Sequence, residues 1–212
     1  MMTNHIRLII QLVLSVGVSC SQANSSVDFF RALNIDNESE VASLLAAGLD
    51  PNTRSEKGQT GLYLAMREGS TKVAALLLAH PAIRVDATNQ ANETALMMAA
   101  LRGNLEWTLR LIERGAAVNR PGWAPLHYAA SGPEVAVVQL LLDRGAQIDA
   151  LAPNRNTALM MAAGYGPEES VTLLLSRGAN PKALNERSMR AADFARSAGR
   201  AALSARLEQA AQ

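Results

Sequence analysis

A chain of 212 residues is long enough for one ordinary domain, and its 49% of apolar residues can fill a core, which excludes wholesale disorder. Its 20 basic and 19 acidic residues nearly cancel, and no segment concentrates Lys or Arg, so neither nucleic acid nor an anionic membrane is favoured as a partner. Aromatic residues make up only 4% whereas Ala and Leu abound, so we expect helices joined by turns.

The first 23 residues have the order of a secretory signal. A short start that carries Arg7 precedes the apolar run 8–18, and small residues follow up to Ala23. The run is too short for a membrane-spanning helix, which needs about 20 apolar residues. We therefore expect a signal peptide over 1–23, cleaved after Ala23, no integral membrane segment, and a periplasmic or secreted protein. The alternative is an ordinary buried N-terminal helix, because little positive charge precedes the run.

Cys20 is the only cysteine, and it lies inside this leader. Cleavage after Ala23 would leave no thiol, so we expect neither a disulfide nor a cysteine-based zinc or nucleophile site. A competing interpretation makes Cys20 a lipid-attachment residue. Gly17 stands where such sites usually have a Leu-like residue, and we therefore expect cleavage after Ala23 rather than lipidation at Cys20.

The rest of the chain, 24–212, repeats itself about every 33 residues. The phrase TALMMAA occurs at 94–100 and again at 157–163. The first residue of this phrase has an equivalent in each repeat, and these positions are Val27, Thr60, Thr94, Ala124, Thr157 and Arg190. A second apolar segment follows each of them. The pattern therefore predicts six repeats, the last a C-terminal cap, over about 24–55, 56–89, 90–119, 120–152, 153–185 and 186–212.

One repeat shows why each should form a pair of helices. Thr157 can cap a helix that begins at Ala158, because its hydroxyl can accept from a free backbone N–H in the first turn. A turn at 166–167 reverses the chain, and the second helix should end at Gly178, where glycine can adopt a left-handed conformation. A single repeat cannot bury both apolar faces, so stacking should supply the stability, with Leu141 of the fourth repeat in the shared core.

These residues resemble the ankyrin repeat family. The family pattern T-P-L-H-x-A-A, followed by a second helix and G-A-D-V-N, is matched most closely by APLHYAA and VVQLLLDRGAQID within 124–149. The resemblance covers about 27–210 and implies an all-α ankyrin-repeat solenoid of stacked helix-turn-helix units with short hairpin loops. It also implies a concave face lined by hairpin tips and first helices, and another protein as the partner.

The histidine at the helix start of the family pattern survives only as His127. At the equivalent positions of four other repeats stand Tyr63, Met97, Met160 and Asp193. The resemblance implies a structural role for His127, with its imidazole bonded to the hairpin backbone. The Met pairs 97–98 and 160–161 suit soft copper ions. Because other repeats hold His-Tyr and Tyr-Leu at these positions, we expect the pairs to pack in the core instead.

The sequence offers no candidate for catalysis. His5 lies in the leader and His80 in a turn, so no metal-ligand cluster remains. Carboxylates such as Glu113 and the pair 168–169 fall on helices that the repeat assigns to the outer layer, where they should be solvated. No nucleophile elbow, phosphate loop or dinucleotide fingerprint is present. We expect no enzyme activity, no metal and no cofactor.

The candidate binding residues are those that stacking leaves free, at the hairpin tips and just after the Ala pair of each first helix. They are Glu56, Lys57, Gln59, Arg67 and Glu68 in the second repeat, Gln90, Glu93, Leu101 and Arg102 in the third, Trp123 and Ser131 in the fourth, and Pro153, Asn154, Asn156 and Tyr165 in the fifth. Trp123 and Tyr165 stand out because aromatic residues are enriched among binding hot spots. We expect Tyr165 to be exposed, whereas Trp123 either faces a partner or packs across its own hairpin.

The connection before the fourth repeat is distinctive. It is three residues shorter from Val118 to His127 than the equivalent stretch from Ile148 to Met160, and it contains Pro121 and Trp123. We expect a notch in the row of hairpins at this place.

Together these features favour a non-catalytic, monomeric protein-binding module in the periplasm of a Gram-negative bacterium. Two alternatives stay open. One is an inhibitor or immunity-type protein that blocks an enzyme or toxin, and the other is an exported effector directed at a host.

Overall fold

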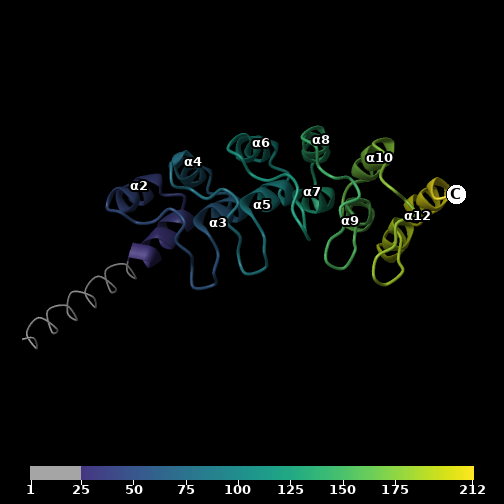
Figure 1. Cartoon of the computed structure of the whole chain (residues 1–212), viewed down its shortest axis with the longest axis horizontal. Helices are drawn as coiled ribbons and strands as arrows, with labels where there is room; N and C mark the ends of the chain where they lie inside the picture. The colour runs from purple at the N-terminus through teal and green to yellow at the C-terminus, as the bar shows by residue number, and fades with distance from the viewer. Residues whose placement is uncertain (1–24) are drawn as a thin grey trace, which may run out of the picture. The chain divides into compact units, whose positions relative to one another are not determined.

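The computed structural model describes residues 25–212. The predicted signal peptide, its cleavage after Ala23 and the alternative lipidation of Cys20 lie outside the described residues. The chain divides into two compact parts at Arg84 and Val85, which we call the N-terminal block (25–84) and the C-terminal block (85–212). Within each block, helices come in consecutive pairs joined by loops (Figure 1). The predicted all-α repeat architecture is therefore confirmed.

The N-terminal block contains two helix pairs. Its helices are 25–34, α2 (Glu38–Ala46), α3 (Gly61–Glu68) and α4 (Thr71–Ala79). Phe29, Val41 and Leu77 are fully buried and form part of its core. Asp36 joins the two pairs, because its carboxylate accepts a hydrogen bond from the backbone N–H of Val73 in the first turn of α4, at 2.9 Å.

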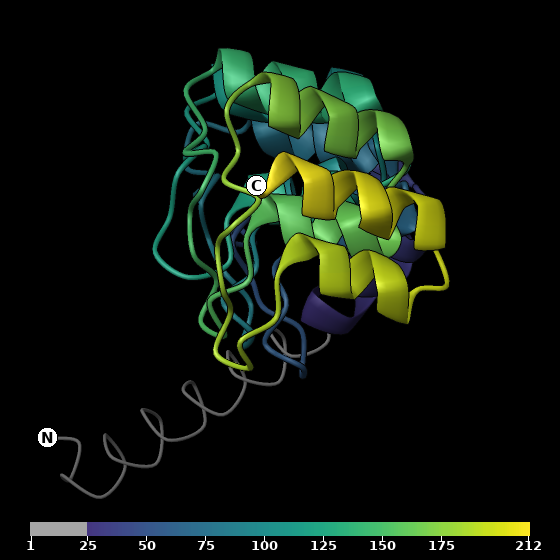
Figure 2. The same cartoon turned by 90° about the vertical axis from the view of Figure 1, so that its right-hand side faces the viewer.

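The C-terminal block contains four helix pairs in two layers. Its helices are α5 (Ala95–Leu101), α6 (Leu105–Glu113), α7 (Pro125–Ser131), α8 (Val135–Asp143), α9 (Ala158–Tyr165), α10 (Glu168–Ser176), α11 (Ala191–Ser197) and α12 (Ala201–Ala210). The first helices α5, α7, α9 and α11 each contact the next, and the second helices α6, α8 and α10 do the same. Figure 2 shows the helices of this block on one side and its connecting loops gathered on the other.

The helix ends follow the residues that the sequence pattern marks. Thr157 Oγ1 accepts from the backbone N–H of Met160 at 3.3 Å, and Thr94 caps α5 in the same way. Just after α10 ends, Gly178 has φ of 88°, a left-handed conformation that costs glycine little. The predicted cap and stop of the fifth repeat are therefore present.

Small residues let neighbouring repeats approach closely. Ala129, Ala130 and Leu141 are all fully buried in one continuous core with the helices of the next repeat. Gly132 ends α7 where a Cβ would lie only 2.7 Å from the carbonyl oxygen of Leu101. A larger residue would push the third and fourth repeats apart, since interiors are packed to crystal-like density.

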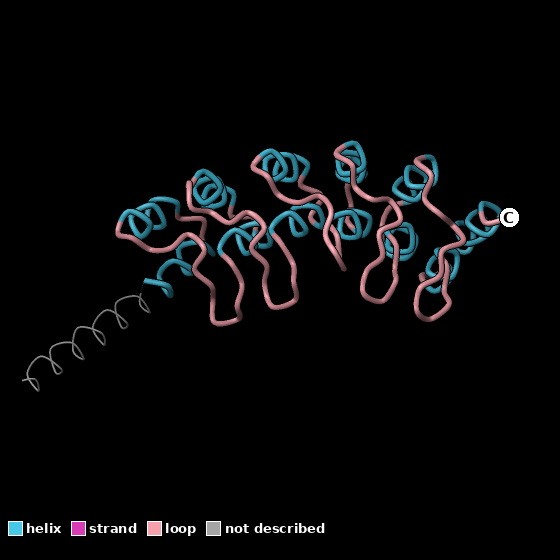
Figure 3. The backbone as a smooth tube through the Cα atoms, in the orientation of Figure 1, coloured by secondary structure: helices cyan, strands magenta, loops and turns pink. Residues whose placement is uncertain are grey.

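Backbone hydrogen bonds close four of the hairpins that precede first helices in the described chain. Asn89 N–H donates to Glu93 O at 3.0 Å, and the pairs Ala152–Asn156 and Asn185–Met189 match it in the fifth and sixth repeats. The loop before α3 closes in the same way. The connection before α7 has no such bond among the described residues, and Figure 3 shows it as a shorter loop than its neighbours before α9 and α11. The expected shortened hairpin is therefore present.

None of the helices in residues 25–212 combines the length and the hydropathy that a membrane crossing requires.

Candidate protein-binding site

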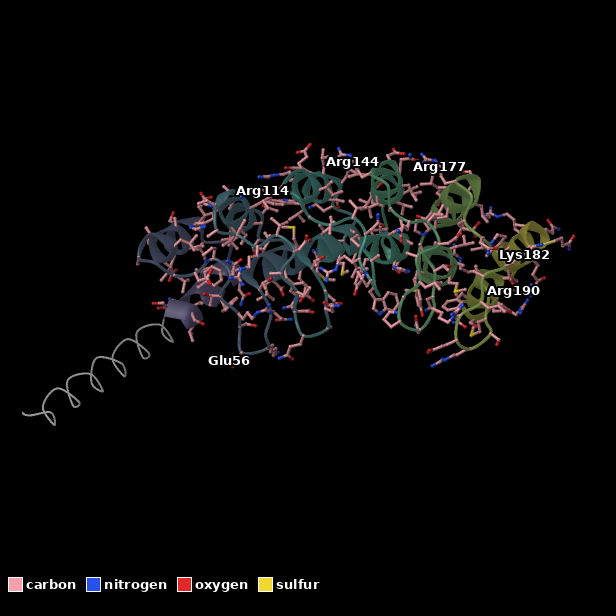
Figure 4. The ribbon with its side chains drawn as sticks, in the orientation of Figure 1. Glu56, Arg114, Arg144, Arg177, Lys182 and Arg190 are labelled. Atoms are coloured by element: carbon pink, nitrogen blue, oxygen red, sulfur yellow. The ribbon has the colours of Figure 1, made fainter. Side chains whose placement is uncertain are left out.

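In the N-terminal block, four predicted residues line one hollow of about 440 Å³. They are Glu56, Lys57, Gln59 and Arg67, and the opposite wall comes from helix 25–34. Glu56 projects from the hairpin tip (Figure 4). Glu68 lies outside the lining, where its Oε1 accepts a hydrogen bond from Arg67 Nε at 2.7 Å. The hollow is therefore bordered by charges of both signs.

In the C-terminal block, Leu101, Trp123 and Ser131 come together. With His127, Tyr128 and Met161 they line a cavity of about 210 Å³, which we call the Trp123 pocket. Three consecutive first helices, α5, α7 and α9, supply all of this lining except Trp123. The Trp123 ring is half-buried and meets the rings of His127 and Tyr128 edge to face, with centroids 5.4 and 6.2 Å apart. Trp123 thus packs within its own repeat and also presents a surface to the pocket.

His127 is held by backbone groups on both sides of its ring. The N–H of Ala124 donates to Nδ1 at 3.1 Å, so the proton of the neutral ring resides on Nε2. Nε2 then donates to the carbonyl oxygens of Ala150 and Asn156, at 3.0 and 3.1 Å. Burial, which penalises the charged form, lowers the pKa of His127. His127 therefore joins the fourth helix pair to the next hairpin, which is the structural role that the resemblance implies.

Three of the four residues that replace this histidine accept the hydrogen bond that its Nδ1 accepts. The backbone N–H before α5 donates to Met97 Sδ at 3.4 Å, and the one before α9 donates to Met160 Sδ at 3.5 Å. Before α11, Asp193 Oδ2 accepts the same kind of bond at 2.8 Å. Met97, Met98 and Met160 are buried, so the prediction that the Met pairs belong to the core holds for these three residues, whereas Met161 is half-buried and lines the Trp123 pocket. No cluster of His, Cys, Asp and Glu suited to a metal was found within 25–212.

The second hollow of the C-terminal block, about 380 Å³, lies between two hairpins and the ends of α9 and α11. Tyr165 lines it and is 68% exposed, as the sequence predicts. Asn154 and Asn156 line it too, but the expected exposure of Asn156 is wrong, because only 7% of this residue is exposed. Its Oδ1 accepts from Asn185 Nδ2 at 2.9 Å. The cause is a contact with the next repeat, which makes Asn156 part of the hairpin scaffold.

The other predicted residues lie outside these hollows. Exposed positions are occupied by Gln90, Arg102 and Pro153. Glu93 is half-buried, and its carboxylate accepts from Tyr128 Oη at 2.9 Å and from Asn89 Nδ2 at 2.7 Å.

Sequence reasoning missed several lining residues. Asn185 was detectable, because it precedes the sixth helix start by five residues just as Asn89 precedes the third, and the Oδ1 of each accepts from its own hairpin backbone. Phe194 carried no comparable signal, because its position in the hollow depends on the packing of α11 against α9.

Capped first helices, a second helical layer and hairpins that precede each first helix define a helical-repeat scaffold. The chain belongs to the ankyrin repeat family, since the family described as Ankyrin repeats (3 copies) matches residues 29–121 and 108–185. Ankyrin repeats mediate protein–protein interaction, and the family is generally non-catalytic.

Relatives share this region over part of their length. The chain is 32% identical over 152 residues to the nuclear factor NF-kappa-B p105 subunit of Gallus gallus, covering 68% of this chain and 16% of that protein. It is 32% identical over 147 residues to a B-cell lymphoma 3 protein homolog of Mus musculus, covering 66% of this chain and 33% of that protein. A probable E3 ubiquitin-protein ligase, XBOS31 of Oryza sativa subsp. japonica, is 32% identical over 137 residues, covering 62% of this chain and 30% of that protein. The chain thus spans at most a third of each of these relatives.

Proposed function

We propose that this chain is a non-catalytic protein-binding module whose partner contacts the hairpins and first helices of the C-terminal block. The observation that supports this most directly is the position of Trp123 and Tyr165. Each lines a hollow built from first helices or hairpins, and neither hollow includes a residue of a second helix. Concave sites with aromatic side chains are where binding energy is usually concentrated.

A double variant, Trp123→Ala with Tyr165→Ala, tests the proposal. We expect it to lose at least about 2 kcal/mol of binding free energy, roughly a thirtyfold rise in Kd, because both aromatic anchors are removed. The partner is first captured with the wild-type chain from the exported fraction, and both proteins are then titrated. Leu105→Ala is the matched control, since Leu105 is 42% exposed but begins α6 in the second layer. Unchanged affinity in a folded double variant would contradict the proposal.

We also propose that the module acts after export, in the periplasm or outside the cell. The support is the leader pattern over residues 1–23. We expect the exported protein to begin at Asn24, as determined by N-terminal sequencing, and Leu14→Arg to block export because a charge interrupts the apolar run. A matched change beyond the leader, Ser25→Arg, should leave export intact. If the wild-type chain is found in the cytosolic fraction alone, with Met1 as its first residue, the proposal of export is ruled out.

A further inference from the structure

We propose that the Trp123 pocket receives one apolar side chain from an extended, acidic segment of the partner protein. This inference rests on the proposed protein-binding function and specifies the chemistry that one part of the site recognises. The Trp123 pocket comprises Leu101, Trp123, His127, Tyr128, Ser131 and Met161.

The size of the pocket suits a side chain better than a small-molecule ligand. Its volume is about 210 Å³, whereas sites for cofactors and other small molecules typically measure about 300–1,000 Å³. Leu101, 37% exposed, stands at its edge. A single leucine, methionine or phenylalanine side chain would bury apolar surface there against Trp123 and Met161, which is the usual basis of a hot spot.

Three polar side chains of the lining, His127, Tyr128 and Ser131, are already engaged. Both ring nitrogens of His127 are bonded to backbone groups, as described above. Tyr128 Oη donates to Glu93, and Ser131 Oγ donates to the carbonyl oxygen of His127 at 3.0 Å. A polar acceptor that entered the pocket would find no free donor among these three side chains and would lose hydrogen bonds to water there, which costs about 1–3 kcal/mol. This favours an apolar occupant.

The arginines around the pocket favour a partner segment with acidic residues beside its apolar anchor. Arg102 follows Leu101 at the end of α5, Arg120 precedes Trp123, and Arg155 lies at the tip of the next hairpin. Arg102 and Arg155 are exposed, and among the described residues none of these three arginines forms an ion pair. Arg120 donates instead to the amide oxygen of Asn92 at 3.3 Å.

Two carboxylates of this region, Glu93 and Glu134, accept hydrogen bonds from neutral groups and keep their negative charges. Glu93 accepts from Tyr128 and Asn89. Glu134 turns back to the backbone N–H of Ala136 in its own helix, at 3.3 Å. The three arginines outnumber these two carboxylates, so aspartate or glutamate on either side of the apolar anchor would complement the remaining positive charge.

The shortened connection leaves room for an extended segment. Neighbouring hairpins of full length pair directly, as the bond from Glu186 N–H to Asn154 O at 3.2 Å shows. On the other flank of the 152–156 hairpin, no backbone hydrogen bond among the described residues joins it to the turn before α7. A Cβ added to Gly122 of that turn would lie 3.6 Å from the ring of Pro153. A partner strand can occupy the position that a complete fourth hairpin would take, next to the pocket.

Selection from a random peptide library on the full chain tests the proposal. We expect the enriched peptides to share an apolar residue flanked by Asp or Glu. Fluorescein-labelled copies of the best peptide should bind Leu101→Asp and Arg102→Glu at least about tenfold more weakly than the wild type, measured by anisotropy. Leu105→Asp and Arg144→Glu are matched controls that should bind normally. Leu105 begins α6, and Arg144 follows α8 in the second layer (Figure 4).

Several outcomes would overturn the pocket proposal. They are the absence of any enriched peptide, enrichment without acidic residues, or an equal loss of binding in the control variants. Because Arg102 is exposed, Arg102→Glu keeps the test valid if Leu101→Asp fails to fold. If the affinity of a captured protein partner falls with Tyr165→Ala but not with Leu101→Asp or Arg102→Glu, the pocket proposal fails. The protein-binding function would then stand.

Discussion

Replacing His127 by alanine is expected to lower the free energy of unfolding by about 3–5 kcal/mol. The change removes the partner of three backbone groups, the N–H of Ala124 and the carbonyls of Ala150 and Asn156, and each buried group left unsatisfied costs about 1–3 kcal/mol. The residue is 1% exposed, so water does not replace these bonds. Urea unfolding followed by far-UV circular dichroism measures the loss.

The chain itself suggests the control, His127→Met. Met97 and Met160 stand at the equivalent position, and each sulfur accepts the N–H that precedes its helix. Methionine at 127 should therefore recover about 1 kcal/mol relative to alanine through this bond and its added packing, but not the two bonds of Nε2. If methionine proves as costly as alanine, the bond to Ala124 contributes nothing to stability.

His127 should also affect how the free energy of unfolding depends on pH. Burial keeps the pKa of His127 below its ordinary value of 6.5 in the folded chain. As the pH falls below 6.5, the unfolded chain binds a proton that the folded chain does not, so stability declines by at most about 1.4 kcal/mol per pH unit until the folded pKa is reached. Above that range the effect is absent. Subtracting the His127→Met profile from the wild-type profile isolates it from the carboxylates.

Leu141→Ala should cost about 2–5 kcal/mol of unfolding free energy. Leu141 is fully buried in α8, in the core that the fourth and fifth repeats share, so its removal leaves a cavity between two stacked repeats. Leu151→Ala is the matched control, because Leu151 is 43% exposed and its loss should cost less than about 0.5 kcal/mol. Equal denaturation midpoints for the two variants would show that the core does not depend on Leu141.

The elements of this fold were predictable because their signals are local. The hydroxyl of Thr157 caps its helix by accepting from the N–H of Met160, three residues away, and Gly178 ends the next helix through its own backbone conformation. Leu141 could be assigned to the core because the repeat gives every position five counterparts with which to compare it. The expected exposure of Tyr165 followed from the same comparison, since it occupies a position that stacking leaves free.

The surface was predictable only in part. Asn156 looks like a free hairpin residue in the sequence, but the amide of Asn185, 29 residues later, donates to it and buries it. The Trp123 pocket combines residues of three repeats, and the sequence marks only three of its six lining residues. Periodicity assigns each residue a place within its own repeat, and it does not show which side chains of neighbouring repeats meet.

The sequence by itself determined the positions of the helix caps and stops, because each depends on residues only a few positions apart. It also determined the family and the shortened connection before the fourth repeat, because both follow from comparing one repeat with the next along the chain. Only the tertiary structure decided that His127 ties one repeat to the hairpin of the next, that Asn156 is buried, and that Leu101, Trp123 and Met161 enclose a pocket. These features arise where repeats stack. Their geometry depends on how the side chains of adjacent repeats pack and hydrogen-bond, which no single repeat contains.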